Sequence, residues 1–266
     1  MNETSPLQSA FLKKHRQHHH LVLFLRILGC ILFLGLWEIS TSLSWIDSFI
    51  FSCPSGILKT LAVMSGDGSL FLHTKVTLYE TLVSFLLVIG ISFLTATLLW
   101  IFPTVSEILE PWLVVLNSLP KSALAPLLIV WLGSGSCTII VAGMSVAVFG
   151  SIISMYTAFR ETDSEKIKLI HTLGGGKREA LCYVIFPSSL PSVISILKVN
   201  IGLCLVGVII GEFLAAREGL GYLIIYASQI FKLNYLIAAL MVLCLIALIL
   251  YTVIQKFEHQ IKRSRS

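Results

Sequence analysis

The sequence has few charged residues for its length. Asp, Glu, Lys and Arg make up 12% of the 266 residues, whereas soluble domains carry about 25%. Hydrophobic residues make up 56%, and they come in long blocks instead of alternating with polar residues. A water-soluble domain needs a polar surface, so this composition excludes one and predicts a protein whose solvent is lipid.

Metal-binding and disulfide patterns are also missing. None of the six cysteines stands in a Cys-x-x-Cys pair or another metal-ligand spacing. We therefore expect no disulfide framework, no metal site and no cofactor. A histidine cluster near the N-terminus could bind a metal ion, but we interpret it as a polar flank at the membrane surface. Its members are His15, His18, His19 and His20.

The sequence contains no phosphate-binding loop. The run Gly174-Gly175-Gly176-Lys177 comes nearest, but such a loop needs glycine at position 171 and Ser or Thr at position 178. His171 and Arg178 stand there instead. No nucleophile–base–acid set occurs in a polar segment either. We expect the chain to be no enzyme and to hydrolyse no ATP itself.

Six apolar blocks are long enough to cross a membrane, which takes about 20 apolar residues in a helix. The spans must be helices because backbone groups in lipid have to pair within their own segment. The predicted fold is therefore an all-α integral membrane protein with about six transmembrane helices. The blocks are Leu21–Leu43, Leu78–Phe102, Pro111–Leu132, Thr138–Phe159, Val193–Leu214 and Tyr235–Phe257.

Polar residues and prolines interrupt the third block. Asn117, Ser118, Pro120, Lys121 and Pro126 lie within it, and proline removes an N–H group and clashes with the preceding turn. We expect this helix to be bent or broken. Irregular backbone at membrane depth is tolerated inside protein or beside a watery cavity, so the segment is predicted to line a substrate path. The alternative is a kink that serves packing alone.

The basic residues indicate the orientation in the membrane. With the N-terminus inside, thirteen of the 19 Lys and Arg residues fall in inner segments and four in outer ones. Basic residues mark cytoplasmic loops, so both termini are predicted in the cytoplasm and about 44–77 outside. The net charge of +5 could indicate a protein that binds nucleic acid. No basic run is interleaved with aromatic residues, however, so no nucleic-acid partner is expected.

The inner loop, about 160–192, is the most polar part of the chain outside the N-terminus. Its apolar residues Ile167, Ile170 and Leu173 follow a helical spacing, which predicts a helix over 164–173. Gly174 is expected to end it. A second short helix, Lys177–Phe186, is expected to end at Pro187 and Pro191. Such a loop could be a docking surface or a connector without a partner.

Few ionisable residues lie in the apolar blocks. Glu38, Glu80 and Lys198 are expected near helix ends, where they can reach the membrane surface. Glu212 follows Gly207 and Gly211 on a helix that can pack closely, so we expect it to face the bundle or the path and not lipid. A proton-driven carrier usually shows several buried acids or histidines, which argues against the alternative of an ATP-independent channel or secondary carrier.

The inner loop also carries a family resemblance. The run Lys168–Gly174, followed by Ile185–Pro191, resembles the cytoplasmic Glu-Ala-Ala loop of permease subunits in binding-protein-dependent ABC importers. Here Lys168-Leu169-Ile170 replaces the Glu-Ala-Ala triplet. Further pieces resemble the nitrate, sulfonate and taurine branch: Trp37-Glu38, Cys53-Pro54-Ser55, Leu119-Pro120 to Trp131-Leu132-Gly133, and Gly211-Glu212-Phe213-Leu214 continuing to Gly219–Ile224.

The resemblance implies one transmembrane permease domain over residues 1–266 with the type I importer fold, in the cell membrane. Two permease copies, as a homodimer, would form the path. Two cytoplasmic ABC ATPase subunits would dock on the inner loops, and an extracellular binding protein would deliver a sulfonate, nitrate or a vitamin precursor. The residues implied in ATPase coupling are Ile167, Lys168, Leu169, Ile170, Leu173, Gly174 and Pro187. The candidate path residues are Asn117, Ser118, Pro120 and Glu212.

Overall fold

The computed structural model describes residues 6–263, and within them every regular element is a helix. Among the described residues, five helices are long and apolar enough to cross a membrane, and a bent pair makes a sixth candidate span. This confirms the predicted fold class. The elements are α1 (Pro6–Ser42), α2 (Ser48–Phe51), α3 (Pro54–Gly66), α4 (Ser69–Ile101), α5 (Pro103–Ser118), α6 (Lys121–Leu132), α7 (Ser136–Arg160), α8 (Ser164–Thr172), α9 (Lys177–Ala180), the π-helical turn η1 (Leu181–Ile185), α10 (Phe186–Ala215), α11 (Leu220–Gln229) and α12 (Leu233–Arg263).

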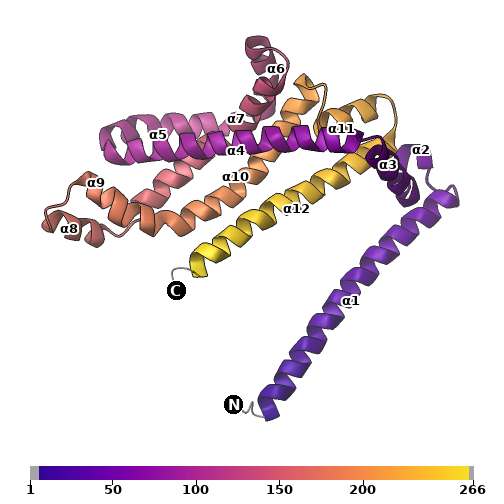
Figure 1. Ribbon diagram of the computed structural model, residues 1–266, viewed down its shortest axis with the longest axis horizontal. Coiled ribbons are helices and arrows are strands. Elements are labelled where there is room, and N and C mark those ends of the chain that lie inside the picture. The colour runs from indigo at the N-terminus through magenta and orange to yellow at the C-terminus, as the bar shows by residue number, and fades with distance from the viewer. Residues whose placement is uncertain (1–5, 264–266) are drawn as a thin grey trace.

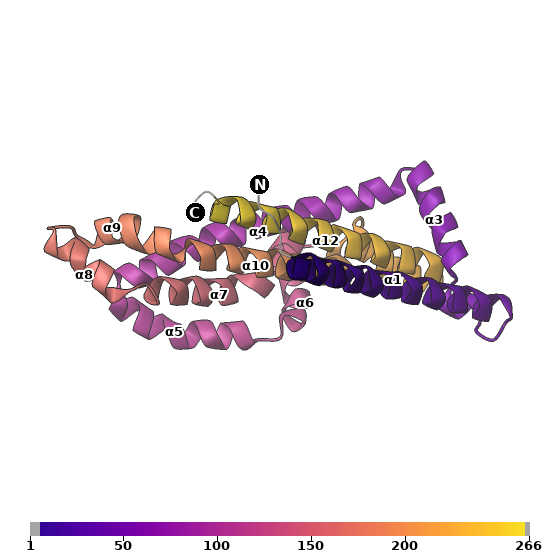
Figure 2. The same ribbon diagram turned by 90° about the horizontal axis from the view of Figure 1, so that it is seen from below.

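The long helices form a bundle with two distinct ends. Figures 1 and 2 show α2 and α3 at one end, and α8 and α9 at the other. Helix α4 runs from the first end to the second, and α10 runs back. The predicted outer loop and the predicted inner loop therefore lie at opposite ends of the bundle.

Helices α4, α7 and α10 form the centre of the bundle. They approach closely because small residues face one another: a Cβ added at Gly207 would lie 2.8 Å from Gly143 Cα, and one added at Gly211 would lie 3.1 Å from Ile139 Cα. In lipid, close packing of small residues is a main source of helix association. Helix α4 also contributes buried residues, which are Thr77, Glu80, Thr81 and Ser84.

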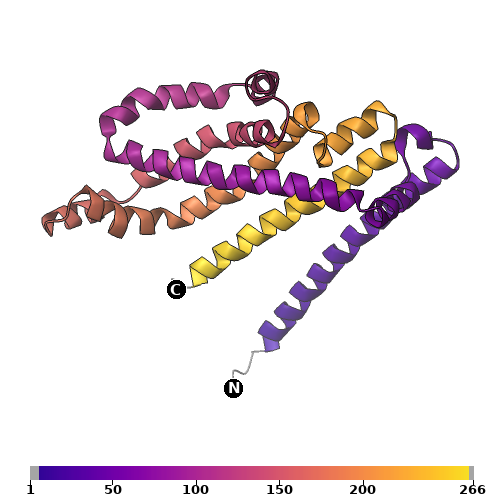
Figure 3. The same cartoon turned by 45° about the horizontal axis from the view of Figure 1, so that its top comes forward.

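The third predicted span is broken, as the sequence indicated. Helices α5 and α6 meet at an angle of 94°, and Figure 3 shows α6 nearly end-on beside α5. The break lies at Leu119 and Pro120. The Lys121 ammonium donates hydrogen bonds to the carbonyls of Leu116 and, at 3.1 Å, Asn117, so it satisfies carbonyl groups that the end of α5 leaves free.

The predicted helix end at Pro187 and Pro191 is wrong. Residues 177–215 form one continuous candidate span, in which η1 joins α9 to α10. Within η1 the Phe186 N–H bonds to the Leu181 carbonyl, a wider turn than that of an α-helix. A π-helical turn locally changes the pattern of backbone hydrogen bonds, so a proline can be accommodated without ending the helix.

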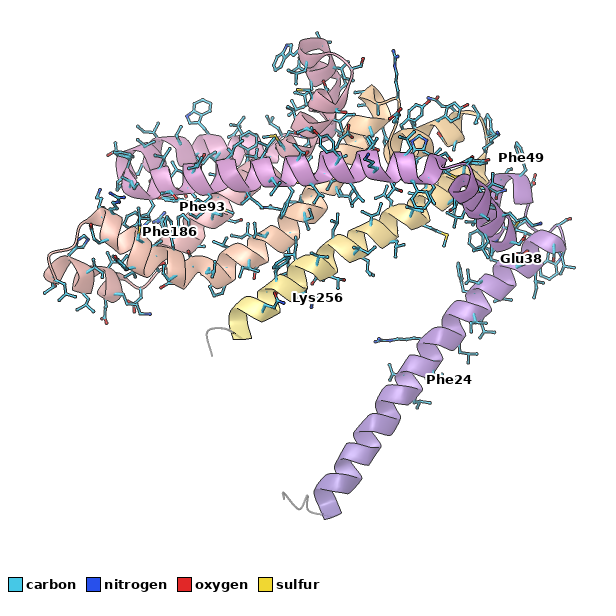
Figure 4. The ribbon with its side chains drawn as sticks, in the orientation of Figure 1. Phe24, Glu38, Phe49, Phe93, Phe186 and Lys256 are labelled. Carbon is cyan, nitrogen blue, oxygen red and sulfur yellow. The ribbon has the colours of Figure 1, made fainter. Side chains whose placement is uncertain are left out.

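The segment between α1 and α4 is folded onto the bundle. Helix α3 buries Ile57, Thr60 and Met64 and contacts α12 and α4. Figure 4 places Glu38 near the end of α1 that leads to this segment. Its carboxylate accepts hydrogen bonds from Ser55 N, at 3.1 Å, and Ser55 Oγ, at 2.7 Å. Glu38 thus ties α1 to the start of α3.

Candidate functional site

Helix α8 has well-formed ends. Asp163 caps its start by accepting a hydrogen bond from Glu165 N at 2.9 Å. At its end, Gly174 N bonds to His171 O at 3.0 Å and Gly175 N to Ile170 O at 2.9 Å, which is the Schellman arrangement. Gly174 has a φ of +87°. The predicted helix and its glycine stop are both confirmed.

The apolar residues of α8 point in two directions. Leu169 and Leu173 are 58% and 75% exposed, whereas Ile167 packs against the buried cluster that contains Phe159 and Ile185. Figure 4 labels Phe93 and Phe186 beside this cluster, and their ring centroids lie 5.0 Å apart. The exposed apolar surface of α8 is therefore made by Leu169 and Leu173, while Ile167 holds the helix to the bundle.

A hydrogen bond ties the inner loop to the end of α4, and a second one lies nearby between α7 and α5. Lys177 Nζ donates to the Ile101 carbonyl at 2.9 Å, where α4 ends. Nearby, Tyr156 Oη donates to Ser106 Oγ at 2.8 Å. This contact of Lys177 was not predicted from the sequence, because its partner lies 76 positions earlier. A displacement of the inner loop would therefore act directly on the end of α4.

Glu212 is buried inside the bundle, with 1% of its surface exposed. Its carboxylate accepts hydrogen bonds from Thr77 Oγ1, at 2.7 Å, and from Gly221 N, at 2.6 Å. This position agrees with the expectation that it does not face lipid. Gly219 and Gly221 leave room for it, since a Cβ at either would lie within 3 Å of its side chain.

Three side chains hold the first turn of α11. Gly221 N bonds to Glu212, Leu220 N bonds to Thr77 Oγ1 at 2.8 Å, and Gly219 N bonds to His73 Nδ1 at 3.0 Å. The first N–H groups of a helix have no partner within it and favour negative charge. Glu212 therefore anchors α11 to α10 and α4. Thr77 and His73 were not identified from the sequence.

Glu80 does not reach the surface, contrary to the expectation. It is completely buried beside Glu212 and Ser136. The reason is that α4 begins at Ser69, nine residues before the predicted start, which places Glu80 about three turns inside the helix. Lys198 instead pairs with Glu258 of α12 at 2.5 Å.

The structure does not bring the candidate path residues together. Asn117, Ser118 and Pro120 are exposed at the break between α5 and α6, and Asn117 faces Gly150 of α7. Gly211, next to Glu212, faces Ile139 of α7. Eleven residues of helix separate these two levels, which is about 16 Å. Glu212 and Asn117 therefore belong to different places in the bundle.

The bundle, the broken span and the inner-loop helix define a multi-pass membrane permease of the type I importer fold. Two solved structures share this fold. The inward-facing MetNI methionine ABC transporter matches 72% of this chain and 93% of its own with a TM-score of 0.61 and 20% identity. An amino acid ABC transporter with histidines matches 77% and 97% with a TM-score of 0.59 and 14% identity.

Residues 87–263 match the family "Binding-protein-dependent transport system inner membrane component", and the chain belongs to this family. A probable ABC transporter permease protein of Haemophilus influenzae is 30% identical over 89% of this chain and 97% of its own. The riboflavin transport system permease protein RibX of Chloroflexus aurantiacus is 29% identical over 87% of each chain. The formylaminopyrimidine transport permease protein ThiX of Halalkalibacterium halodurans is 26% identical over 84% and 89%. The protein is thus the membrane-spanning permease subunit of an ATP-driven importer.

Proposed function

We propose that two copies of this chain form the substrate path of one importer and that α8 docks on a cytoplasmic ATPase subunit. An extracellular binding protein then supplies the substrate, and ATP is hydrolysed in the partner. The observation that carries the proposal is the exposed pair Leu169 and Leu173. In water these side chains would stay exposed, whereas a groove on a partner would bury them and gain about 25 cal/mol for each Å².

The orientation supports this assignment. The excess of basic residues supports a cytoplasmic location for the α8–α9 end of the bundle and for both termini, on the side of the membrane where ATP is available. The contact of Lys177 with the end of α4 gives the docked loop a direct connection to a membrane-spanning helix. We further propose that Asn117, Ser118 and Pro120 line the path at the broken span, and that the whole chain is one permease domain.

The substrate is proposed to be a small anion, such as a sulfonate or nitrate, or a vitamin precursor. Relatives are named for aliphatic sulfonates, taurine, riboflavin and formylaminopyrimidine. The second candidate function is an ATP-independent channel or secondary carrier. The exposed apolar residues on α8 favour the ATP-driven importer, because a channel has no need of a docking helix.

The docking proposal is tested at Gly174. Its φ of +87° is strained for any side chain, and β-branched valine is among the least tolerant, so Gly174→Val costs about 1 kcal/mol or more locally. An added Cβ meets no other atom there, so the bundle should still fold and insert. We expect ATPase copurification and uptake to fall at least about fivefold, as 1 kcal/mol implies.

Gly174→Asn is the matched control, because asparagine tolerates the left-handed conformation much better than a β-branched residue does. It should retain both ATPase binding and uptake within about twofold. If Gly174→Val assembles with the ATPase and transports at the wild-type rate, α8 is not the docking element.

A further inference from the structure

Two carboxyl groups lie side by side inside the bundle, where α4 and α10 meet the start of α11. The Glu80 side chain is completely buried, and 1% of Glu212 is exposed. The two carboxyl groups are within hydrogen-bonding reach of one another. Among the described residues, no Lys, Arg or His forms an ion pair with either of them. This part of the described structure therefore holds two neighbouring acids without a countercharge.

The hydrogen bonds differ between the two groups. Glu212 accepts from Thr77 Oγ1 at 2.7 Å and from Gly221 N at 2.6 Å, and bonds of this kind favour an ionised carboxylate. Neither oxygen of Glu80 accepts a hydrogen bond from any described residue, although the Ser136 hydroxyl lies beside it. Glu212 therefore has the surroundings of a carboxylate, and Glu80 has those of a neutral carboxyl group.

One proton would stabilise this arrangement. Two neighbouring carboxylates in an apolar interior are costly, because they repel one another and both lose their hydration. Ionised carboxylates are also acceptors only, so neither can donate to the other. One added proton removes one charge and supplies the missing donor. A protonated Glu80 then donates its O–H to the carboxylate of Glu212.

We propose that Glu80 and Glu212 share a single proton at neutral pH, and that this proton is a pH-sensitive switch at the α3–α11 end of the bundle. Glu80 carries the proton, and Glu212 holds the first turn of α11 through Gly221 N. At higher pH the proton passes to water in the adjoining cavity of about 470 Å³, and two carboxylates remain. Their repulsion then loosens the contact of α11 with α4 and α10.

The shared proton makes the stability of the protein depend on pH. Glutamic acid side chains in an unfolded chain lose their protons near about pH 4. At neutral pH the folded chain therefore binds one proton more than the unfolded chain does. Stability then falls as the pH rises, and the unfolding constant grows about tenfold for each pH unit until the folded pair also loses its proton.

Other groups at this end of the bundle titrate as well. His73 accepts a hydrogen bond from the start of α11 through Nδ1, so its protonation at lower pH would remove that bond and change stability in the opposite sense. A variant that changes Glu80 alone leaves these groups in place. Among the described residues, the titratable and charged groups around the pair are His73 on α4, Cys137 on α7, Arg217 and Glu218 on the α10–α11 loop, and Tyr222 on α11.

The experiment measures the equilibrium unfolding of the purified full-length chain in detergent at two pH values, about 7 and about 8. Glu80→Gln is the test variant, because its amide N–H can donate to Glu212 and cannot be lost as a proton. Over this interval the unfolding constant of the wild type should rise about tenfold more than that of Glu80→Gln. Glu218→Gln is the matched control, because it removes an exposed carboxylate from the lining of the same cavity. It should keep the wild-type pH dependence.

Glu212→Gln shows which of the two groups carries the proton. Thr77 and Gly221 donate to different oxygens of Glu212, so an amide group leaves one of these donors without an acceptor. This variant should raise the unfolding constant at least about tenfold at neutral pH, as expected for a lost hydrogen bond to a charged group. Glu80→Gln should fold like the wild type, because an amide can replace a protonated carboxyl group as a donor.

Wild-type pH dependence of the Glu80→Gln variant would overturn the inference. So would failure of this variant to fold, because an amide cannot replace a carboxylate that accepts hydrogen bonds through both oxygens. The infrared spectrum gives a second, independent measurement. The wild type at neutral pH should show the C=O stretching band of a protonated carboxyl group, which shifts in heavy water and is absent from Glu80→Gln. A wild-type spectrum without this band would show that both carboxyl groups are ionised, and the inference would fail.

Discussion

At the scale of single residues, the buried side chain of Glu212 explains why positions 219 and 221 are glycine, because a Cβ at Gly219 or Gly221 would collide with it. The sequence distinguished Glu212 because an acid is rare within an apolar block, and its burial agrees with that expectation. Its partner Thr77 lies 135 positions away, and no local pattern indicates which helix faces which. The prediction that Glu80 lies near a helix end was wrong for a related reason. The first residues of α4 are partly polar, so the apolar pattern did not show that the helix begins at Ser69.

The contact between Glu212 and the start of α11 leads to a stability prediction. A Cβ at Gly219 would lie 2.4 Å from Glu212 Cδ, and one at Gly221 would lie 2.8 Å from Glu212 Oε2. Gly219→Ala and Gly221→Ala should each destabilise the protein by about 1–3 kcal/mol through overpacking. Gly219→Ala also carries backbone strain, because φ there is +112°.

Thermal unfolding of the purified protein in detergent checks this prediction. Gly202→Ala is the matched control, because it lies within α10 and a Cβ there meets no atom within 4 Å. It should unfold at or slightly above the wild-type temperature, since alanine favours the helix more than glycine does. Equal melting temperatures for all three variants would show that the start of α11 is not packed against Glu212.

At the scale of elements, proline had different consequences in different places. Pro120 lies at a true break, where the side chains of Ser118 and Lys121 donate hydrogen bonds to backbone carbonyls at the end of α5. Pro126 lies inside α6 without ending it, and Pro187 follows the π-helical turn η1. Local sequence marks a possible helix end, but the neighbouring turn and its packing decide whether the helix stops.

Helix α8 shows the reverse case, in which local sequence was sufficient. Gly174 and the apolar spacing predicted its length and its stop because helical periodicity and glycine conformation are local effects. The direction in which each side chain points depends instead on distant segments of the chain. Ile167 turns toward the bundle because the cluster around Phe159 and Ile185 lies behind it, and that leaves Leu169 and Leu173 to meet a partner.

At the scale of the whole molecule, composition was enough for the class. Long apolar blocks and few charges predicted an all-helical membrane protein, and the order of motifs indicated the importer family to which the chain belongs. The angle of 94° between α5 and α6, the anchor of α11 and the burial of Glu80 depend on packing between distant segments. These features could not be predicted from the sequence.

The orientation is tested by labelling single cysteines from outside intact cells, with the six native cysteines replaced by alanine. Asp67→Cys, in the exposed turn between α3 and α4, should react with a membrane-impermeant maleimide. Lys166→Cys, exposed on α8, should react only after the cells are opened, because basic loops stay in the cytoplasm. The opposite labelling pattern would reverse the topology and leave α8 out of reach of an ATPase.

The central claim is that transport through this chain is driven by ATP hydrolysed in another subunit. The most direct measurement is uptake into proteoliposomes that contain the permease with its ATPase and binding protein, compared with vesicles from which the ATPase is withheld. The account predicts ATP-dependent accumulation in the complete system, and neither accumulation nor ATP hydrolysis with the permease alone. Substrate flux of equal rate without the ATPase, or ATP hydrolysis by the purified permease, would contradict it.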